Sequence, residues 1–211
     1  FFFTPTPPYE ILSGLVGSEM CIRDSPIIDK PLIEYAVEEA VMAGIEEIIF
    51  ITSHTKRSIE DHFDTNLELE EKLLKSGKKD AVKKINRNIF QDVTFTYVRQ
   101  KSQKGLGHAI LQAKHLIQDE SFAILLADDL IINNPSATQQ LINVAQKTNS
   151  SVIGLNKVPQ EHISRYGVIS SADASKDEKL FLLDGIVEKP QSSPPSDMAV
   201  FGRYIIFLGF I

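Results

Sequence analysis

The chain has little cysteine, no excess of positive charge and no long hydrophobic run. Cys21 is the single cysteine in 211 residues, so an internal disulfide framework is excluded, and the lack of a His/Cys cluster argues against a zinc site. The net charge of -6 and the pI of about 5.4 argue against a general nucleic-acid surface. No apolar run reaches transmembrane length. We therefore expect a soluble, globular protein of the reducing cytoplasm, without nucleic-acid or membrane partners.

The chain does contain enough apolar sequence for one sizeable core, with 43% hydrophobic and 24% charged residues. Apolar periodicity predicts a helix at 30–43, ended by Gly44, and a buried-type strand at 46–52. Further helices are expected at 58–63, 67–85 with an interruption at 76–77, and 137–147, and further strands at 93–98, 122–127, 151–155, 167–170, 180–183 and 198–206. This alternation predicts an α/β fold.

The segment VRQKSQKGLGHA joins a predicted strand to the apolar face of a helix. Gly105 and Gly107 let the backbone pass close to a ligand, and the N-terminus of the helix favours anions. Gln100 lies where the strand ends, and its amide can both donate to and accept from the edge of a base. The segment is typical of a phosphate-handling loop, although an ordinary strand-to-helix turn would have the same composition.

Two carboxylates end the next buried strand, in the segment SFAILLADDL. Ligands of open α/β sheets collect at the carboxyl ends of strands, so Asp128 and Asp129 lie where Mg²⁺ and its phosphates would be held. The alternative is a solvated loop with a helix cap. Because the loop and the acid pair occur on adjacent βα units, we favour the functional interpretation.

The chain contains, in this order, the segments PIIDKPLIEYAVEEAVMAGIEEIIFITS, SIEDHFDTNLELEEKL, VRQKSQKGLGHAI, LLADDLI, RYGVI, GIVEKP and FGRYI. This series resembles the bacterial UTP–glucose-1-phosphate uridylyltransferases of the sugar nucleotidyltransferase superfamily over residues 26–206. The shorter segments are shared with glucose-1-phosphate thymidylyltransferases, whereas HFDTNLELE with its Lys/Glu-rich helical insertion resembles the uridylyltransferase branch. The resemblance implies a Rossmann-like mixed, mainly parallel sheet flanked by helices, the nucleotide-diphospho-sugar transferase fold.

The resemblance also implies a reaction. A phosphate oxygen of glucose 1-phosphate attacks the α-phosphorus of UTP, pyrophosphate leaves and UDP-glucose forms, with Mg²⁺ as cofactor and no covalent nucleophile. By resemblance, Gln100 and the Gly105 backbone meet the uracil, and Asp128 is the Mg²⁺ ligand. Asp129 is the weaker candidate, because the metal acid of the family follows a small residue, here Ala127. The parent enzyme is expected to be a homo-oligomer.

The later segments resemble the sugar-binding part of the family. Tyr166 and Gly167 match the position where the backbone approaches glucose, Glu188 would accept hydrogen bonds from sugar hydroxyls, and Lys189 would pair with the sugar phosphate and act in catalysis. Taken alone, a Glu-Lys-Pro strand end is more often a solvated edge. Gly202 is a lesser candidate for approach to the sugar, with a strand bulge as its alternative.

Residues 1–25 do not fit this pattern, and residues 26–211 form the expected partial nucleotidyltransferase domain. FFFTPTPPYEILSGLVGSEMCIRDS lacks an initiator Met and has no periodicity, and its SGLVGSEMCIRD resembles a translated sequencing adapter. We therefore expect a non-native segment where the family has its first strand and its Gly-Thr-Arg loop, which wraps the triphosphate. The sheet would be incomplete at both ends, and a second metal-binding Asp would lie beyond residue 211.

Two hypotheses follow from this departure: an enzyme making UDP-glucose, or a truncated product that at most binds ligand or a partner subunit. The remaining candidates are interpreted as structural. Asp29 and Lys30 are expected to fix the start of the first helix, with contact between Lys30 and a phosphate as the alternative. The histidines near the motifs form no recognisable triad and are expected to be structural or on the surface, namely His54, His62, His108 and His162.

Overall fold

The computed structural model describes residues 9–13, 26–27, 30–53, 57–64, 67–78, 88–102, 104–117, 121–174 and 180–206. Its elements are β1 (Tyr9–Ser13), β2 (Pro26–Ile27), β3 (Lys30–Pro31), α1 (Leu32–Met42), β4 (Glu47–Thr52), α2 (Arg57–Phe63), α3 (Leu67–Lys75), η2 (Asn88–Phe90), β5 (Thr94–Arg99), α5 (Leu106–Gln112), β6 (Phe122–Leu125), α6 (Ala137–Thr148), β7 (Val152–Lys157), η3 (Gln160–Arg165), β8 (Gly167–Ala174), β9 (Phe181–Glu188) and β10 (Met198–Ile206).

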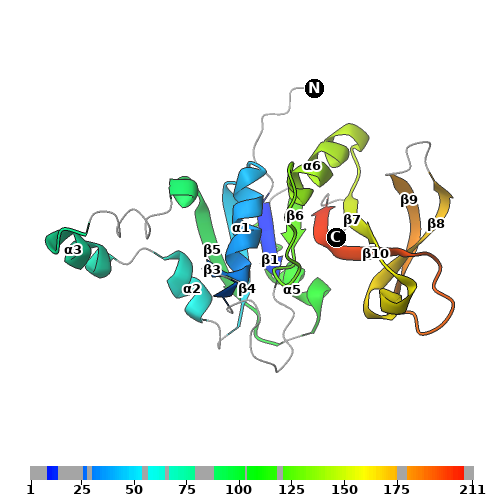
Figure 1. The fold of residues 1–211 in the computed structure, drawn as a ribbon, viewed down its shortest axis with the longest axis horizontal. Coiled ribbons are helices and arrows are strands. Elements are labelled where there is room, and N and C mark those ends of the chain that lie inside the picture. Colours follow the sequence, from blue (N-terminus) through cyan, green and yellow to red (C-terminus); the bar gives the residue numbers. More distant parts are fainter. Residues whose placement is uncertain are drawn as a thin grey trace.

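One mixed sheet of eight strands organises the described residues, in the order β5-β4-β1-β6-β10-β8-β9 with β7 paired to β10. Strands β5, β4, β1 and β6 are parallel, whereas β10 runs antiparallel to β6, β7 and β8. In Figure 1 the β8–β9 hairpin projects from one end of the sheet and α3 from the other. The predicted α/β fold with a mixed sheet flanked by helices is confirmed.

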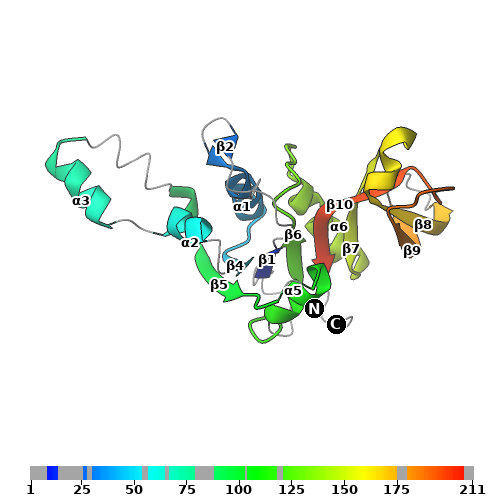
Figure 2. The ribbon, with the colours of Figure 1, turned by 90° about the horizontal axis from the view of Figure 1, so that it is seen from below.

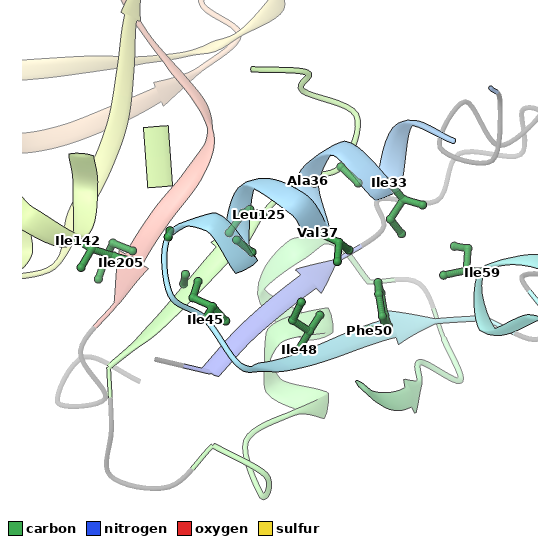
Figure 3. Packing of buried hydrophobic residues seen from close by; sticks show 14 of the residues in the cluster. Ile33, Ala36, Val37, Ile45, Ile48, Phe50, Ile59, Leu125, Ile142 and Ile205 are labelled. Atoms are coloured by element: carbon green, nitrogen blue, oxygen red, sulfur yellow. The ribbon is translucent and has the colours of Figure 1, made fainter. Parts of the chain in front are cut away.

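Helices cover both faces of the parallel strands. Alternate residues of a strand point to opposite faces, so Ile48 and Phe50 pack into a core cluster with α1 and α6, and Ile49 and Ile51 into a second cluster with α5. Figure 2 shows α1 and α5 on opposite sides of the sheet, and Figure 3 shows the first cluster beneath α1. Each fully buried aliphatic side chain of this kind stabilises the fold by about 1.5–3 kcal/mol.

The helix boundaries follow from local sequence signals. The apolar stripe of α1 ends before Gly44, whose φ of +86° allows the chain to turn back into β4. Helix α6 begins where the Ser136 hydroxyl accepts from the Gln139 N–H at 3.1 Å, and it ends at Asn149 in the left-handed conformation. The Lys/Glu-rich segment predicted as an excursion forms α3 up to Lys75, and residues 79–87 lie outside the described part.

The expectation that the first strand of the sheet is missing is wrong. Strand β1, with the sequence YEILS, pairs in parallel with both β4 and β6 and so fills the centre of the sheet. The buried strands β4 and β6 have backbone N–H and C=O groups that need hydrogen-bond partners on the sides where they face each other. The segment YEILS provides these partners, and its Tyr and Ile favour a strand. The place expected for the Gly-Thr-Arg loop, residues 14–25, lies outside the described residues.

Candidate functional site

The predicted site residues lie along the edge of the sheet where the parallel strands end. Gln100 follows β5, and Asp128 and Asp129 follow β6. Strand β4 lies on one side of β1 and β6 lies on the other. The chain therefore adds strands first in one direction from β1 and later in the opposite direction. In open α/β sheets this is where a ligand-binding crevice forms. A cavity beside η3, bounded by Lys157, Pro159 and Ile163, includes none of the predicted site residues.

The connection from β5 to α5 holds Gln100 and Gly105. Gln100 is 8% exposed, its backbone N–H donates to the carbonyl of Thr52 at 2.9 Å, and its Nε2 lies 2.7 Å from Nδ1 of His108. Gly105 precedes the first residue of α5 with φ +89°, a conformation that side chains other than glycine rarely adopt. The loop therefore places backbone groups at the start of α5 near the Gln100 side chain, whose amide is hydrogen-bonded to His108.

The two adjacent acids after β6 have different surroundings. Asp129 Oδ2 accepts from the backbone N–H of Gly202 at 2.7 Å, so this carboxylate fastens the turn to β10. Asp128 is exposed. Exposure at the end of β6 leaves Asp128 accessible to a cation shared with a ligand, so it stays the metal candidate, whereas Asp129 has a structural role in the turn.

A buried ion pair, missed from sequence, holds this turn. Arg203 is 1% exposed and Glu39 is 5% exposed, and Arg203 Nε and Nη2 donate to both carboxylate oxygens of Glu39 at 2.8–3.2 Å. The remaining guanidinium N–H groups donate to the carbonyls of Leu126 and Gly202 through Nη1, and to that of Asp129 through Nη2. All donors of the guanidinium are thereby satisfied.

Glu39 extends the same network to α6. Its Oε1 accepts from both the backbone N–H and the hydroxyl of Thr138, at 3.0 and 2.7 Å, which caps the start of that helix. The network thus joins α1, α6, β10 and the turn that carries Asp128. The available sequence signal was a glutamate three residues after Ala36, inside the apolar stripe of α1.

The hydroxyl of Tyr204, on β10, is influenced by charges from both groups of predicted residues. Burial raises the pKa of its hydroxyl, and three carboxylates raise the pKa further, those of Asp129, Glu188 and Asp128. Negative charge close to a tyrosine disfavours its anionic form. The metal candidate and the sugar candidate therefore both raise the pKa of this hydroxyl, which stays protonated.

The predicted sugar-binding residues come together at the base of the β8–β9 hairpin. Gly167 is paired with Glu188, and a Cβ on Gly167 would lie 3.1 Å from Glu188 Oε2. Lys189 has φ +46° and donates its backbone N–H to the carbonyl of Tyr166 at 3.0 Å, and its Nζ lies 3.7 Å from Glu188 Oε1. A non-glycine residue in this conformation is uncommon, and such strain concentrates at functional sites.

Gly202 has a packing role in the structure. A Cβ there would lie 2.4 Å from Leu126 Cβ and 2.8 Å from Asp129 Oδ2, and the pairing of β10 with β7 shifts register between Val200 and Tyr204. The irregular strand considered as an alternative at this position is therefore present. Gly202 permits the close approach of β10 to the turn that carries the acids.

The residues interpreted as structural have partners of their own. Lys30 pairs with Glu38 and lies over the ring of Tyr35, in agreement with a role at the start of α1. His62 Nε2 lies 2.7 Å from the carboxylate of Glu34. His162 lies 3.6 Å from Glu161. Asp29 and His54 lie outside the described residues.

Comparison with known proteins identifies the family. The model of the family described as nucleotidyl transferase matches residues 23–207. This chain belongs to that family. Curated relatives named UTP–glucose-1-phosphate uridylyltransferase, from Staphylococcus haemolyticus and Staphylococcus epidermidis, are each 47% identical over 187 residues and cover 86% of this chain. The chain spans 62% of the length of these relatives.

Solved structures agree with the fold. A UDP-glucose pyrophosphorylase from Acinetobacter baumannii has a TM-score of 0.85 at 33% identity, covering 95% of this chain and 74% of its own. A UDP-glucose pyrophosphorylase in complex with UDP-glucose has a TM-score of 0.79 at 41% identity, covering 94% and 75%. Among the described residues, no helix combines the length and the apolar character needed to span a membrane.

Proposed function

We propose that this chain is a cytoplasmic enzyme that transfers the uridylyl group of UTP to glucose 1-phosphate, giving UDP-glucose and pyrophosphate. The observation that carries the proposal is the edge where the parallel strands end, because Gln100 follows β5 there and the exposed Asp128 follows β6, on the two sides of β1. The relatives named above support it, since a chain 47% identical to uridylyltransferases over 86% of its length has the same core.

The spacing of the two groups favours a long ligand. Gln100 follows β5 and Asp128 follows β6, and these strands are separated by β4 and β1. Three strand spacings correspond to about 14 Å. A ligand that contacts both residues must be elongated and have a chemically different group at each end, which suits a nucleotide joined to a sugar.

Each proposed residue has one role in the transfer. The amide of Gln100 and the backbone at Gly105 bind the base. The backbone at Gly167 and the carboxylate of Glu188 bind sugar hydroxyls. Lys189 offsets the charge of the sugar phosphate, whose oxygen attacks the α-phosphorus of UTP while the bond to pyrophosphate breaks. Positioning of two polyanions is thus the main contribution of the protein.

Asp128 fits a divalent cation that is shared with phosphates. The described residues contain no group of three His, Cys, Asp or Glu side chains with ligand geometry. Mg²⁺ commonly takes only one or two carboxylates and completes its shell with waters and substrate phosphates. Asp128 would hold Mg²⁺, which would supply charge neutralisation during transfer. A cage of protein ligands is not required.

The thymidylyltransferase alternative has less support. The relatives and solved structures reported above are named for UTP or UDP-glucose, and UTP-bound and UDP-glucose-bound forms are among the structures. Uracil and thymine present the same hydrogen-bonding edge to Gln100, so the residues themselves do not separate the two bases.

Pyrophosphate release with UTP, glucose 1-phosphate and Mg²⁺ tests the proposal. We expect Asp128→Asn to lower turnover by about 10²–10³-fold, with a raised Mg²⁺ requirement and unchanged folding. Asp129→Asn is the matched control, because an amide oxygen can still accept from Gly202, and we expect a smaller loss. Unchanged turnover in Asp128→Asn would remove this residue from the metal site. No release by the unmodified chain would favour a binding fragment, and preference for dTTP would favour the thymidylyltransferase.

A further inference from the structure

His108 was interpreted from sequence as structural, but it contacts the residue proposed to bind the base. Its Nδ1 lies 2.7 Å from Nε2 of Gln100, across a gap of eight residues that includes the β5–α5 loop. Gln100 is buried at 8% exposure, and its main chain is fixed by the bond to Thr52. The side-chain contact therefore joins the first turn of α5 to a residue whose backbone has no freedom to move.

The chemistry of the two atoms fixes the arrangement. An amide nitrogen can only donate, so Nδ1 of His108 accepts, and the ring proton is on Nε2. Gln112 Nε2 lies 3.4 Å from His108 Nε2, which would suit the opposite tautomer. The 2.7 Å contact is much the stronger of the two, and Gln112 also donates to the backbone carbonyl of His108 at 3.1 Å. The proton therefore belongs on Nε2.

Fixing the nitrogen of an amide also fixes its oxygen. With Nε2 facing His108, the planar amide places Oε1 on its other side, where that oxygen can accept but not donate. A free glutamine can rotate its amide by half a turn and offer either atom to a ligand. His108 could meet the turned amide only with its proton on Nδ1, so the Nε2-protonated ring favours the orientation in the structure.

Pyrimidine bases differ at the position that such an acceptor reads. Uracil carries a hydrogen on N3 and can donate to Oε1, whereas N3 of cytosine has a lone pair that repels it. We propose that His108 is a specificity-determining residue, which orients the Gln100 amide so that the site selects uracil over cytosine. The inference rests on the proposed function, because it places the base of UTP against Gln100.

Helix packing holds the histidine in place. Ala109 and Ala113, the residues that follow His108 on the inner face of α5, are buried in the second core cluster. The start of α5 is set by Gly105. His108 itself is half-buried, but it lies in the first turn of this packed helix and not in the loop, which suits the orientation of another side chain.

Two substitutions separate orientation from structure. His108→Leu removes the acceptor while keeping a side chain of similar size. His108→Asn places a carbonyl oxygen near the position of Nδ1 and keeps the acceptor. Dissociation constants of UTP and CTP, measured by calorimetry with Mg²⁺ on the full chain, give the preference as a ratio.

We expect the unmodified chain to prefer UTP, His108→Leu to reduce the ratio about tenfold, and His108→Asn to keep it within about threefold of the original. If His108→Leu weakens the binding of UTP and CTP equally, or leaves the ratio of their dissociation constants unchanged while UTP still binds, the orienting role of His108 is wrong. Neither result would count against the proposed function. Absence of UTP binding by the unmodified chain would instead count against the proposed function. If His108→Leu fails to fold, His108→Ala gives the same comparison.

Discussion

The parallel strands and the β8–β9 hairpin carry the two halves of the proposed site on very different supports. Strand β6 is buried at every residue and β4 at every residue but the first, and both faces are covered. Along β9, buried positions are absent and Leu182 is 74% exposed. The residues proposed to bind the base and the metal therefore extend from a packed core, whereas Glu188 and Lys189 lie on an open hairpin.

The difference shows how one domain can combine rigidity and adaptability. Elements with many buried contacts open rarely, and those with few open at low free energy. We expect the nucleotide end to be preformed and the sugar end to adjust. Strand β10 connects the two, since it pairs with β6 on one side and with β8 on the other.

The largest loss of stability should come from Arg203→Met. The change leaves the Glu39 carboxylate buried without its cation and frees the turn after β6, and loss of one partner of a buried pair costs about 3–5 kcal/mol. Urea denaturation should show this loss in the free energy of unfolding. Arg203→Lys should lose less, because it keeps the charge but not the fork of donors. A loss below about 1 kcal/mol in Arg203→Met would show that the network is dispensable.

Gly202→Ala should have an intermediate effect. Its Cβ would lie 2.4 Å from Leu126 Cβ, and overpacking of this kind costs about 1–3 kcal/mol. Gly107→Ala is the matched control, because a Cβ there meets nothing within 4 Å and alanine favours a helix. Thermal unfolding of the two variants checks the contrast. Equal melting temperatures would contradict the close approach of β10 to the turn.

The smallest effect is expected in the hairpin. Leu182→Ala should change the free energy of unfolding by no more than about 0.5 kcal/mol, as is usual for an exposed position. Leu125→Ala, at a residue of β6 with 0% exposure, should cost about 2–5 kcal/mol. Urea denaturation of both variants measures the difference between the two regions. A comparable loss at Leu182 would mean that the hairpin is as tightly packed as the core.

Sequence reasoning succeeded where a local pattern dictates the outcome. The apolar stripe of α1 with Gly44 after it, the buried run of β4 and the bounds of β10 were all predicted, because periodicity and turn chemistry are properties of neighbouring residues. The same holds for the position of Gln100 at a strand end and of Asp128 after a buried strand.

The missed features depend on distant partners. Strands β8 and β9 extend beyond the predicted 167–170 and 180–183. Gly185 disfavours a strand but is held in one by pairing with Ser170, and Asp184 is skipped at the register shift beside it. Strand β1 was dismissed because its surroundings looked foreign, although its own residues suit a strand. The Glu39–Arg203 pair and the contact between His108 and Gln100 join separate elements, and spacing along one element does not show them.

The Glu39–Arg203 pair also sets an order of assembly. Glu39 meets Thr138 across 99 residues and Arg203 across 164, and until β10 is in place β6 is an open edge with apolar surface on both faces. Contacts that close such long stretches of chain form late. While the polypeptide is being synthesised, the turn with Asp128 therefore waits for a strand that leaves the ribosome about seventy residues later, and an edge of this kind is open to wrong pairing in the interval.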